Sequence, residues 1–231
     1  IRRQRQMCIR DSYKEAVISY LSGLSEEARL IGAVNTLVRS EEGYVGHNTD
    51  IAGMERMLLR QGLSIRGAKV LVLGAGGAAR SAAVLAALKG AAELVILNRN
   101  KERAEALAKS LRNVAPELPV LTEGLDAWES LSGNDYLAIQ CTSVGMWPKT
   151  EVSVIEDPRF YEKLSAAADI VYTPAETKFL RLARAAGKPT VGGLPMLISQ
   201  GIHAFSLWTG KTCTAADEES LLELVREALP A

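Results

Sequence analysis

Short apolar runs and longer amphipathic stretches follow one another along the middle of the chain. The runs predict strands that are buried on both faces, as in a parallel sheet: AKVLVLG, ELVILN, LPVLT, DYLAIQ, ADIVYT and KPTVGG. Helical spacing of apolar residues appears between runs, in an alanine-rich segment that ends near Gly90, in KERAEALAKSL and in ETKFLRLARAAG. This alternation predicts an α/β fold built on a doubly wound parallel sheet.

The two ends of the chain have a different pattern. KEAVISYL predicts a short helix, and GAVNTLVRSEEGYVGHNTD predicts two extended segments around a Glu-Gly turn. IAGMERMLLRQG then places Ile51, Met54, Met57 and Leu58 on one helix face, with Gly62 as the stop. From about residue 194 the chain reads as helical again, in LISQGIHAFSLWTG and DEESLLELVREAL.

Composition limits the function classes. Lys plus Arg and Asp plus Glu both number 27, so the chain lacks the basic excess of a general nucleic-acid binder. No apolar run reaches the 18 or so residues of a membrane span. Cys8, Cys141 and Cys213 have no metal or disulfide spacing, which is typical of a reducing cytoplasm. Two histidines cannot form a His-based zinc site. We therefore expect a cytoplasmic protein with no metal site, no nucleic-acid partner and no membrane association.

A glycine-rich loop follows the first strand of the sheet. Gly74, Gly76 and Ala79 form a G-x-G-x-x-A pattern that opens a helix. Gly74 permits the tight turn, and Gly76 lets the backbone approach a pyrophosphate. The N–H groups at the start of the helix would face the phosphates. The pattern predicts a dinucleotide site, and the alternative is a glycine turn that binds nothing.

The end of the next strand indicates which dinucleotide. NAD-binding proteins usually carry an acidic residue there, which holds the ribose 2′-OH. This chain instead has Asn98, Arg99 and Arg103, and guanidinium groups bind a 2′-phosphate. The sequence therefore favours NADP over NAD. The alternative, a solvated helix start, is weakened because cations are disfavoured at a helix N-terminus.

Hydride transfer to a ketone requires a proton donor near the nicotinamide. His47 and His203 are the first candidates, but His203 has the spacing of an ordinary helix residue and His47 has no evident partner. A Lys–Asp pair would also serve, since the carboxylate can orient and tune the ammonium. Spacing alone favours structural roles for Lys14, as a surface lysine, and for Asp50, as a helix N-cap.

Six motifs together resemble the shikimate dehydrogenase family, in its order and at its spacing: IGAVNTLV, GHNTDIAG, VLVLGAGGAARSAA, LNRNKERA, DIVYTPAETKFL and GLPMLISQG. The resemblance runs from about Tyr13 to the C-terminus. It implies the reversible, NADP-dependent reduction of 3-dehydroshikimate to shikimate, in aromatic amino-acid and chorismate biosynthesis. It also implies two lobes, a Rossmann NADP domain at residues 51–198 and a smaller, discontinuous substrate domain at residues 1–50 and 199–231.

The resemblance assigns roles to individual residues. Lys14 and Asp50 match the catalytic pair and also contact the substrate, together with Asn35, Tyr172 and Gln200. The matched cofactor positions are the pyrophosphate loop (Gly74, Ala75, Gly76, Gly77, Ala78), the 2′-phosphate site (Asn98, Arg99, Arg103), the turn at Thr142 and Ser143, and the nicotinamide pocket (Ile170, Gly193).

The chain departs from the family in two places. Gln140 stands where the turn before Thr142 usually has asparagine. The family also begins with several βα units and an S-x-S motif that grips the substrate carboxylate, whereas RQMCIRDS stands where N-V-T-x-P is expected. We expect residues 1–12 to be foreign to the protein, the substrate domain to be incomplete, and turnover to be weak while NADP binding is partly retained. The alternatives are a quinate/shikimate dehydrogenase that uses NAD or NADP, and an inactive dinucleotide-binding fragment. A homodimer is left open.

Overall fold

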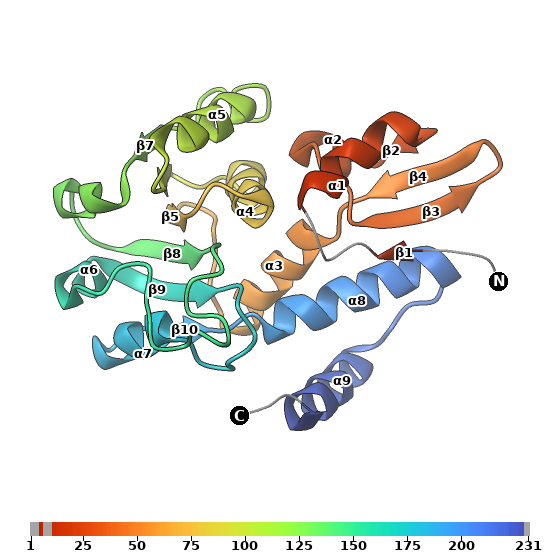
Figure 1. The fold of residues 1–231 in the computed structure, drawn as a ribbon. Coiled ribbons are helices and arrows are strands. Elements are labelled where there is room, and N and C mark those ends of the chain that lie inside the picture. The colour runs from red at the N-terminus through yellow and green to blue at the C-terminus, as the bar shows by residue number, and fades with distance from the viewer. Residues whose placement is uncertain (1–4, 7–10, 229–231) are drawn as a thin grey trace.

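A computed structural model describes residues 5–6 and 11–228 of the chain. Figure 1 shows two lobes, one built on each of two sheets, with helices α3 (Asp50–Arg60) and α8 (Leu194–Thr209) lying between them. Most of the segment 1–12 that the sequence sets apart lies outside the described residues, so its foreign origin stays a prediction.

The larger lobe holds six parallel strands in the order β10-β9-β8-β5-β6-β7. The strands are β5 (Lys69–Leu73), β6 (Glu93–Leu97), β7 (Val120–Glu123), β8 (Tyr136–Gln140), β9 (Leu164–Asp169) and β10 (Thr190–Val191). The helical elements of this lobe are α4 (Gly77–Leu88), α5 (Lys101–Leu111), η2 (Leu125–Ser130), α6 (Pro158–Glu162) and α7 (Lys178–Ala185). The predicted doubly wound parallel sheet is confirmed.

Both faces of this sheet are buried, which explains the continuous apolar runs. Val70 and Val72 belong to the core that includes α4, whereas Leu71 and Leu73 belong to a second core that contains the aromatic rings of α6 and α7. Because successive side chains of a strand point to opposite faces, a strand between two cores must be apolar at every position.

The predicted strand ADIVYT is wrong at both ends. Strand β9 spans Leu164–Asp169, and Ile170 to Tyr172 lie in the loop that follows it. The Asp169 carboxylate accepts the backbone N–H of Val171 at 2.9 Å, so this donor is not available to a neighbouring strand. The chain therefore leaves the sheet directly after the aspartate.

The smaller lobe contains a four-stranded sheet in the order β1-β3-β4-β2. Its elements are β1 (Arg5–Gln6), α1 (Asp11–Ala16), η1 (Val17–Tyr20), β2 (Gly23–Leu24), α2 (Glu26–Ile31), β3 (Thr36–Ser40) and β4 (Gly43–His47). Strands β3 and β4 form the antiparallel pair that the sequence predicts around a Glu-Gly turn. The short elements β1, β2 and α2 were not predicted.

Helices α3 and α8 pack closely against each other. The predicted apolar face of α3 is buried, with Met54 and Met57 fully inaccessible. At Gly53 an added Cβ would lie 2.7 Å from the Gln200 Cγ and 2.9 Å from the Met196 carbonyl oxygen. Only glycine therefore permits this helix separation. The predicted domain boundaries fall at the start of α3 and inside α8, and they stay a prediction.

The C-terminal helix α9 (Ala215–Ala228) docks through a buried acid. Glu218 is 5% exposed, accepts from the Arg56 guanidinium at 2.9 Å, and accepts from the Ser199 hydroxyl at 3.1 Å. Within residues 5–6 and 11–228, no helix combines the length and the hydropathy that crossing a bilayer requires. The same residues contain no group of three His, Cys, Asp or Glu side chains placed to hold a metal ion.

Candidate active site

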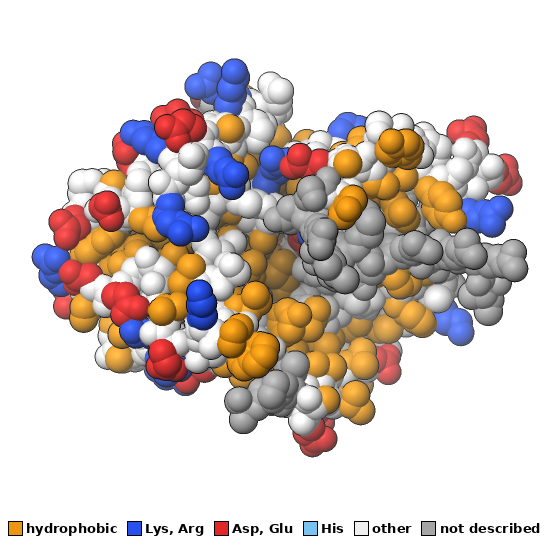
Figure 2. All heavy atoms as spheres, viewed as in Figure 1, with side chains coloured by type: hydrophobic (Ala, Val, Ile, Leu, Met, Phe, Trp, Pro, Cys, Tyr) orange, Lys and Arg blue, Asp and Glu red, His pale blue; other side chains and the backbone are white. Residues whose placement is uncertain are grey.

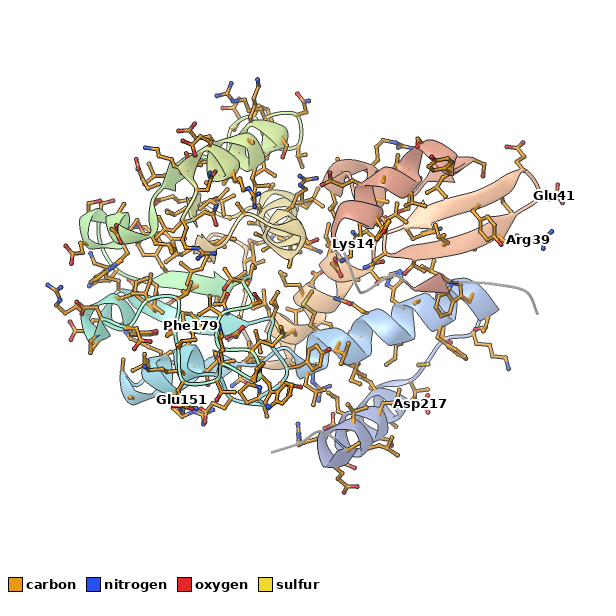
Figure 3. The ribbon with its side chains drawn as sticks, viewed as in Figure 1. Lys14, Arg39, Glu41, Glu151, Phe179 and Asp217 are labelled. Carbon is orange, nitrogen blue, oxygen red and sulfur yellow. The ribbon has the colours of Figure 1, made fainter. Side chains whose placement is uncertain are left out.

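A pocket of about 520 Å³ lies where the two lobes meet, at the carboxyl ends of the central strands β5, β8 and β9. It is lined from the smaller lobe and α3 by Lys14, Asn35 and Asp50, and from the larger lobe by the start of α4 and the loops after β8 and β9. Figure 3 shows Lys14 at the junction of the smaller lobe with α3. This edge of a doubly wound sheet is where such folds bind ligands.

Lys14 and Asp50 form an ion pair in this pocket. The Lys14 Nζ lies 3.7 Å from the Asp50 Oδ2, and the two side chains are 13% and 10% exposed. The Lys14 carbonyl accepts the N–H of Val34 at 2.8 Å, which fixes the lysine-bearing helix to the chain leading into β3. Helix α3 begins at Asp50 itself and Thr49 takes the cap position, so the alternative role of Asp50 as an N-cap is wrong.

Asn35 holds the other oxygen of the same carboxylate. Its amide nitrogen donates to the Asp50 Oδ1 at 2.9 Å. Its amide oxygen accepts from the Thr36 hydroxyl at 2.9 Å and from the Thr49 backbone N–H at 3.0 Å. These donors fix which way the amide points, because only its oxygen can accept them. The carboxylate of Asp50 is thus oriented between an amide and an ammonium.

The histidines lie elsewhere. Neither His47 nor His203 lines the pocket, and burial lowers the pKa of His47. Cys141 does line the pocket, but burial raises the pKa of its thiol, so it stays neutral near pH 7. Among the described pocket residues, the Lys14–Asp50 pair is the arrangement suited to move a proton to or from a bound hydroxyl or carbonyl.

The glycine loop leads into the start of α4, which forms one end of the pocket. Gly74 has φ +119° and an added Cβ would lie 3.1 Å from the Thr142 side chain, so the turn requires glycine. Gly76, Gly77 and Ala78 line the pocket at the first turn of α4. The first N–H groups of a helix have no partner within it, and here no side chain caps them. Such a helix start fits a pyrophosphate.

The predicted 2′-phosphate residues Asn98, Arg99 and Arg103 follow β6 and do not line the pocket. The Leu97 carbonyl accepts the Gly74 N–H at 2.8 Å, which places the end of β6 next to the glycine turn. Asn98 is partly buried, whereas Arg99 and Arg103 are exposed and make no ion pair with another described residue. Two exposed guanidinium groups that follow β6 fit a phosphate better than a ribose hydroxyl.

Most of the remaining predicted residues meet in the pocket. Gln200 is 9% exposed on α8, and Tyr172 is 41% exposed on the loop after β9. Ile170 and Gly193 touch, since a Cβ on Gly193 would lie 2.1 Å from the Ile170 carbonyl oxygen. Of all predicted positions, the structure brings together Lys14, Asn35, Asp50, Gly76, Gly77, Ala78, Thr142, Ser143, Ile170, Tyr172, Gly193 and Gln200. It leaves Gly74, Ala75, Asn98, Arg99 and Arg103 outside the lining.

Sequence reasoning missed two groups of residues. Met146 and Trp147 line the mouth of the pocket and are 47% and 67% exposed. Asp169 and Thr177 are fully buried beneath the loops after β8 and β9, and the available signal was an acidic residue at the end of the apolar run AAAD.

Two segments of the chain match families of known proteins. Residues 57–131 match the family described as shikimate / quinate 5-dehydrogenase, and residues 193–215 match the shikimate 5′-dehydrogenase C-terminal domain. A shikimate dehydrogenase (NADP(+)) from Moorella thermoacetica is 40% identical over 221 residues, which cover 95% of this chain and 73% of that protein. This chain belongs to the shikimate dehydrogenase family.

Solved structures of related dehydrogenases have the same fold. Shikimate 5-dehydrogenase from Thermus thermophilus, in complex with NADP(H) and shikimate, gives a TM-score of 0.82 at 34% identity, over 98% of this chain and 79% of that one. Quinate dehydrogenase from Corynebacterium glutamicum, in complex with NAD, gives 0.80 at 30% identity, over 91% and 75%. The family resemblance is thus confirmed, whereas the roles of individual residues stay predictions.

Proposed function

We propose that this member of the shikimate dehydrogenase family catalyses the reversible, NADP-dependent reduction of 3-dehydroshikimate to shikimate. The observation that carries the proposal is the Lys14–Asp50 ion pair, which shares one pocket with the glycine-rich start of α4. A proton donor and a pyrophosphate-binding turn in one pocket are the two parts that such a dehydrogenase requires.

In this proposal one end of the pocket binds the cofactor, and the other end binds the substrate. Gly76, Gly77 and Ala78 bind the pyrophosphate, and the pocket wall at Ile170 and Gly193 faces the nicotinamide. When bound, NADPH supplies the hydride. Arg99 and Arg103 bind the 2′-phosphate beside the glycine loop, which explains two exposed cations near a helix N-terminus.

The polar residues on the other side hold the ring and move the proton. Lys14 donates a proton to the oxygen of the ketone as it becomes a hydroxyl, and accepts it in the reverse direction. Asp50 keeps the ammonium in place and accepts a hydrogen bond from a substrate hydroxyl. Asn35, Tyr172 and Gln200 contact the other polar groups of the substrate. The Lys14 and Asp50 side chains are only 13% and 10% exposed, so most of their surface is shielded from solvent.

The test is a steady-state assay of the purified chain, with shikimate or quinate as the substrate and NADP⁺ or NAD⁺ as the cofactor. We expect NADP⁺ reduction that depends on shikimate and disappears in the Lys14→Met variant. Faster oxidation of quinate with NAD⁺ than of shikimate with NADP⁺ would support the alternative, a quinate/shikimate dehydrogenase. The related quinate dehydrogenase from Corynebacterium glutamicum has been solved in complex with NAD. Binding of NADPH without turnover of either substrate would support an inactive dinucleotide-binding fragment. The cytoplasmic location expected from the cysteines stays a prediction.

A further inference from the structure

Three buried polar residues lie directly behind the pocket wall and have no part in the proposed chemistry. Gln140 ends β8, Asp169 ends the adjacent strand β9, and the two are paired in the sheet register. Thr177 is the N-cap of α7. All three are fully inaccessible to solvent. Together, Gln140, Asp169 and Thr177 form the polar cluster.

Gln140 holds the turn that follows β8. Its amide oxygen accepts the backbone N–H of Thr142. Its amide nitrogen donates to the Val144 carbonyl at 3.1 Å and to the Asp169 Oδ1 at 3.2 Å. One side chain therefore closes the turn and fastens it to the neighbouring strand.

Asp169 holds the loop that follows β9. Its Oδ1 also accepts the Val171 N–H at 2.9 Å, and its Oδ2 accepts the Thr177 hydroxyl at 2.6 Å. The two loops are joined again nearer the solvent, where the backbone N–H of Trp147 donates to the Thr173 carbonyl at 3.0 Å. The two loops are thus joined by the buried Gln140–Asp169 hydrogen bond and by a backbone hydrogen bond nearer the solvent.

We propose that the polar cluster positions the nicotinamide wall of the pocket, by fixing the turn at Thr142 and Ser143 relative to the loop at Ile170. This inference rests on the proposed function, because the wall is assigned to the nicotinamide there. The cluster touches no ligand, so its members are positioning residues. Three buried hydrogen-bonding side chains are costly to leave without partners. Here their partners are the pocket loops, one another and, for the Thr177 hydroxyl, the Leu180 N–H of α7 at 3.4 Å.

Gln140 stands where the family resemblance leads us to expect asparagine. Its amide nitrogen reaches both the Val144 carbonyl and the Asp169 carboxylate. In this chain the glutamine amide therefore connects the two loops.

The experiment compares variants that remove one hydrogen-bonding group each. Gln140→Met and Thr177→Val keep the side-chain size but lose the amide or the hydroxyl, and Thr177→Ser restores the hydroxyl. Tyr136→Phe is the matched control, because Tyr136 is fully buried at the opposite end of β8, where its hydroxyl donates to the Ser132 carbonyl at 3.1 Å. For each variant we would measure the NADPH dissociation constant by fluorescence, kcat for shikimate oxidation, and unfolding in urea.

We expect Gln140→Met and Thr177→Val to weaken NADPH binding about tenfold and to lower kcat, as the loss of a buried hydrogen bond at a binding wall would. Thr177→Ser should stay within about threefold of wild type, since the hydroxyl is retained. Tyr136→Phe should lower the free energy of unfolding without changing the NADPH dissociation constant or kcat.

Two results would overturn the inference. One is wild-type NADPH affinity and kcat in both Gln140→Met and Thr177→Val, which would leave the cluster a purely stabilising role. The other is an equal loss of NADPH affinity in Tyr136→Phe. If wild type binds NADPH but does not oxidise shikimate, the proposed function fails, while the ranking of NADPH affinities still decides the positioning role. A wild-type chain that does not bind NADPH contradicts both.

Discussion

Asp169 should make the stability of this protein depend on pH in an unusual direction. Burial raises the pKa of its carboxyl from 3.8 to about 6, against the opposing effect of its three hydrogen bonds. The folded protein therefore binds this proton more tightly than the unfolded chain does. The resulting contribution to the free energy of unfolding is complete below about pH 4 and is lost as the pH rises through 6.

The size of the effect follows from the shift. About two pKa units at 1.36 kcal/mol each correspond to roughly 3 kcal/mol over the whole titration. Between pH 5 and pH 7.5, the part that is lost is about 1.4 kcal/mol. In the Asp169→Asn variant the group does not titrate, so its unfolding free energy should lack this loss. The difference between variant and wild type should thus move by about 1.4 kcal/mol in the variant's favour.

The assay is urea unfolding of both proteins at pH 5 and at pH 7.5, followed by fluorescence and extrapolated to water. The exposed Asp126, changed to asparagine in the same way, is the matched control for loss of an acidic residue. A difference between wild type and Asp169→Asn that is the same at both pH values would refute the reasoning, as would a shift that favours wild type at pH 7.5.

Three further predictions concern the proposed site and its packing. Lys14→Met should lower kcat about 10³-fold, which is the usual contribution of a proton donor. Its NADPH affinity, measured by fluorescence titration, should be unchanged. A decrease in kcat of less than about tenfold would contradict the proposed role of Lys14. Arg99→Gln and Arg103→Gln should each raise KM for NADP⁺ about tenfold and leave KM for NAD⁺ unchanged in steady-state assays; equal losses with both cofactors would argue against a 2′-phosphate site. Gly193→Ala places a Cβ 2.1 Å from a carbonyl oxygen and should destabilise the fold by about 1–3 kcal/mol in urea. Gly201→Ala lies inside α8, the helix that Gly193 caps, meets no atom within 4 Å and should not destabilise the fold in this way. Similar effects of both variants would contradict the packing argument.

The sequence predicted the larger lobe well because its signals are local. Each strand between two cores must be apolar at every position, and each helix between strands carries its own apolar stripe. The prediction failed at ADIVYT, where the apolar residues Ile170 and Val171 line a pocket instead of continuing a strand. Hydrophobicity alone does not separate these two kinds of burial.

Sequence motifs predicted the residues that line the candidate site, but not the polar cluster behind it. Lys14 and Asp50 were selected by resemblance, since neither residue has a distinctive neighbourhood in the sequence, and the fold places them 3.7 Å apart. The polar cluster was missed because its members come from three separate segments, and only the register of β8 against β9 brings Gln140 next to Asp169. Pairings of this kind exist only once the sheet has formed.

The equal numbers of acidic and basic residues are distributed over both lobes. On the face shown in Figure 2, Lys and Arg side chains alternate with Asp and Glu around the described part of the molecule. Among the residues that the structure describes, most ion pairs have at least one exposed partner, and in Arg159 with Glu129 both are exposed. Exposed pairs contribute little to stability. The stability of the fold therefore rests on its apolar cores.

The absence of a side chain at Gly53 decides where a pocket residue can lie. Gln200 lines the pocket from α8, and its Cγ would lie only 2.7 Å from a Cβ at position 53. Even one methyl group at position 53 would therefore push Gln200, or the backbone of α8 at the Met196 carbonyl, away from α3. The placement of a residue that faces the bound molecule thus depends on a glycine that lies outside the pocket lining.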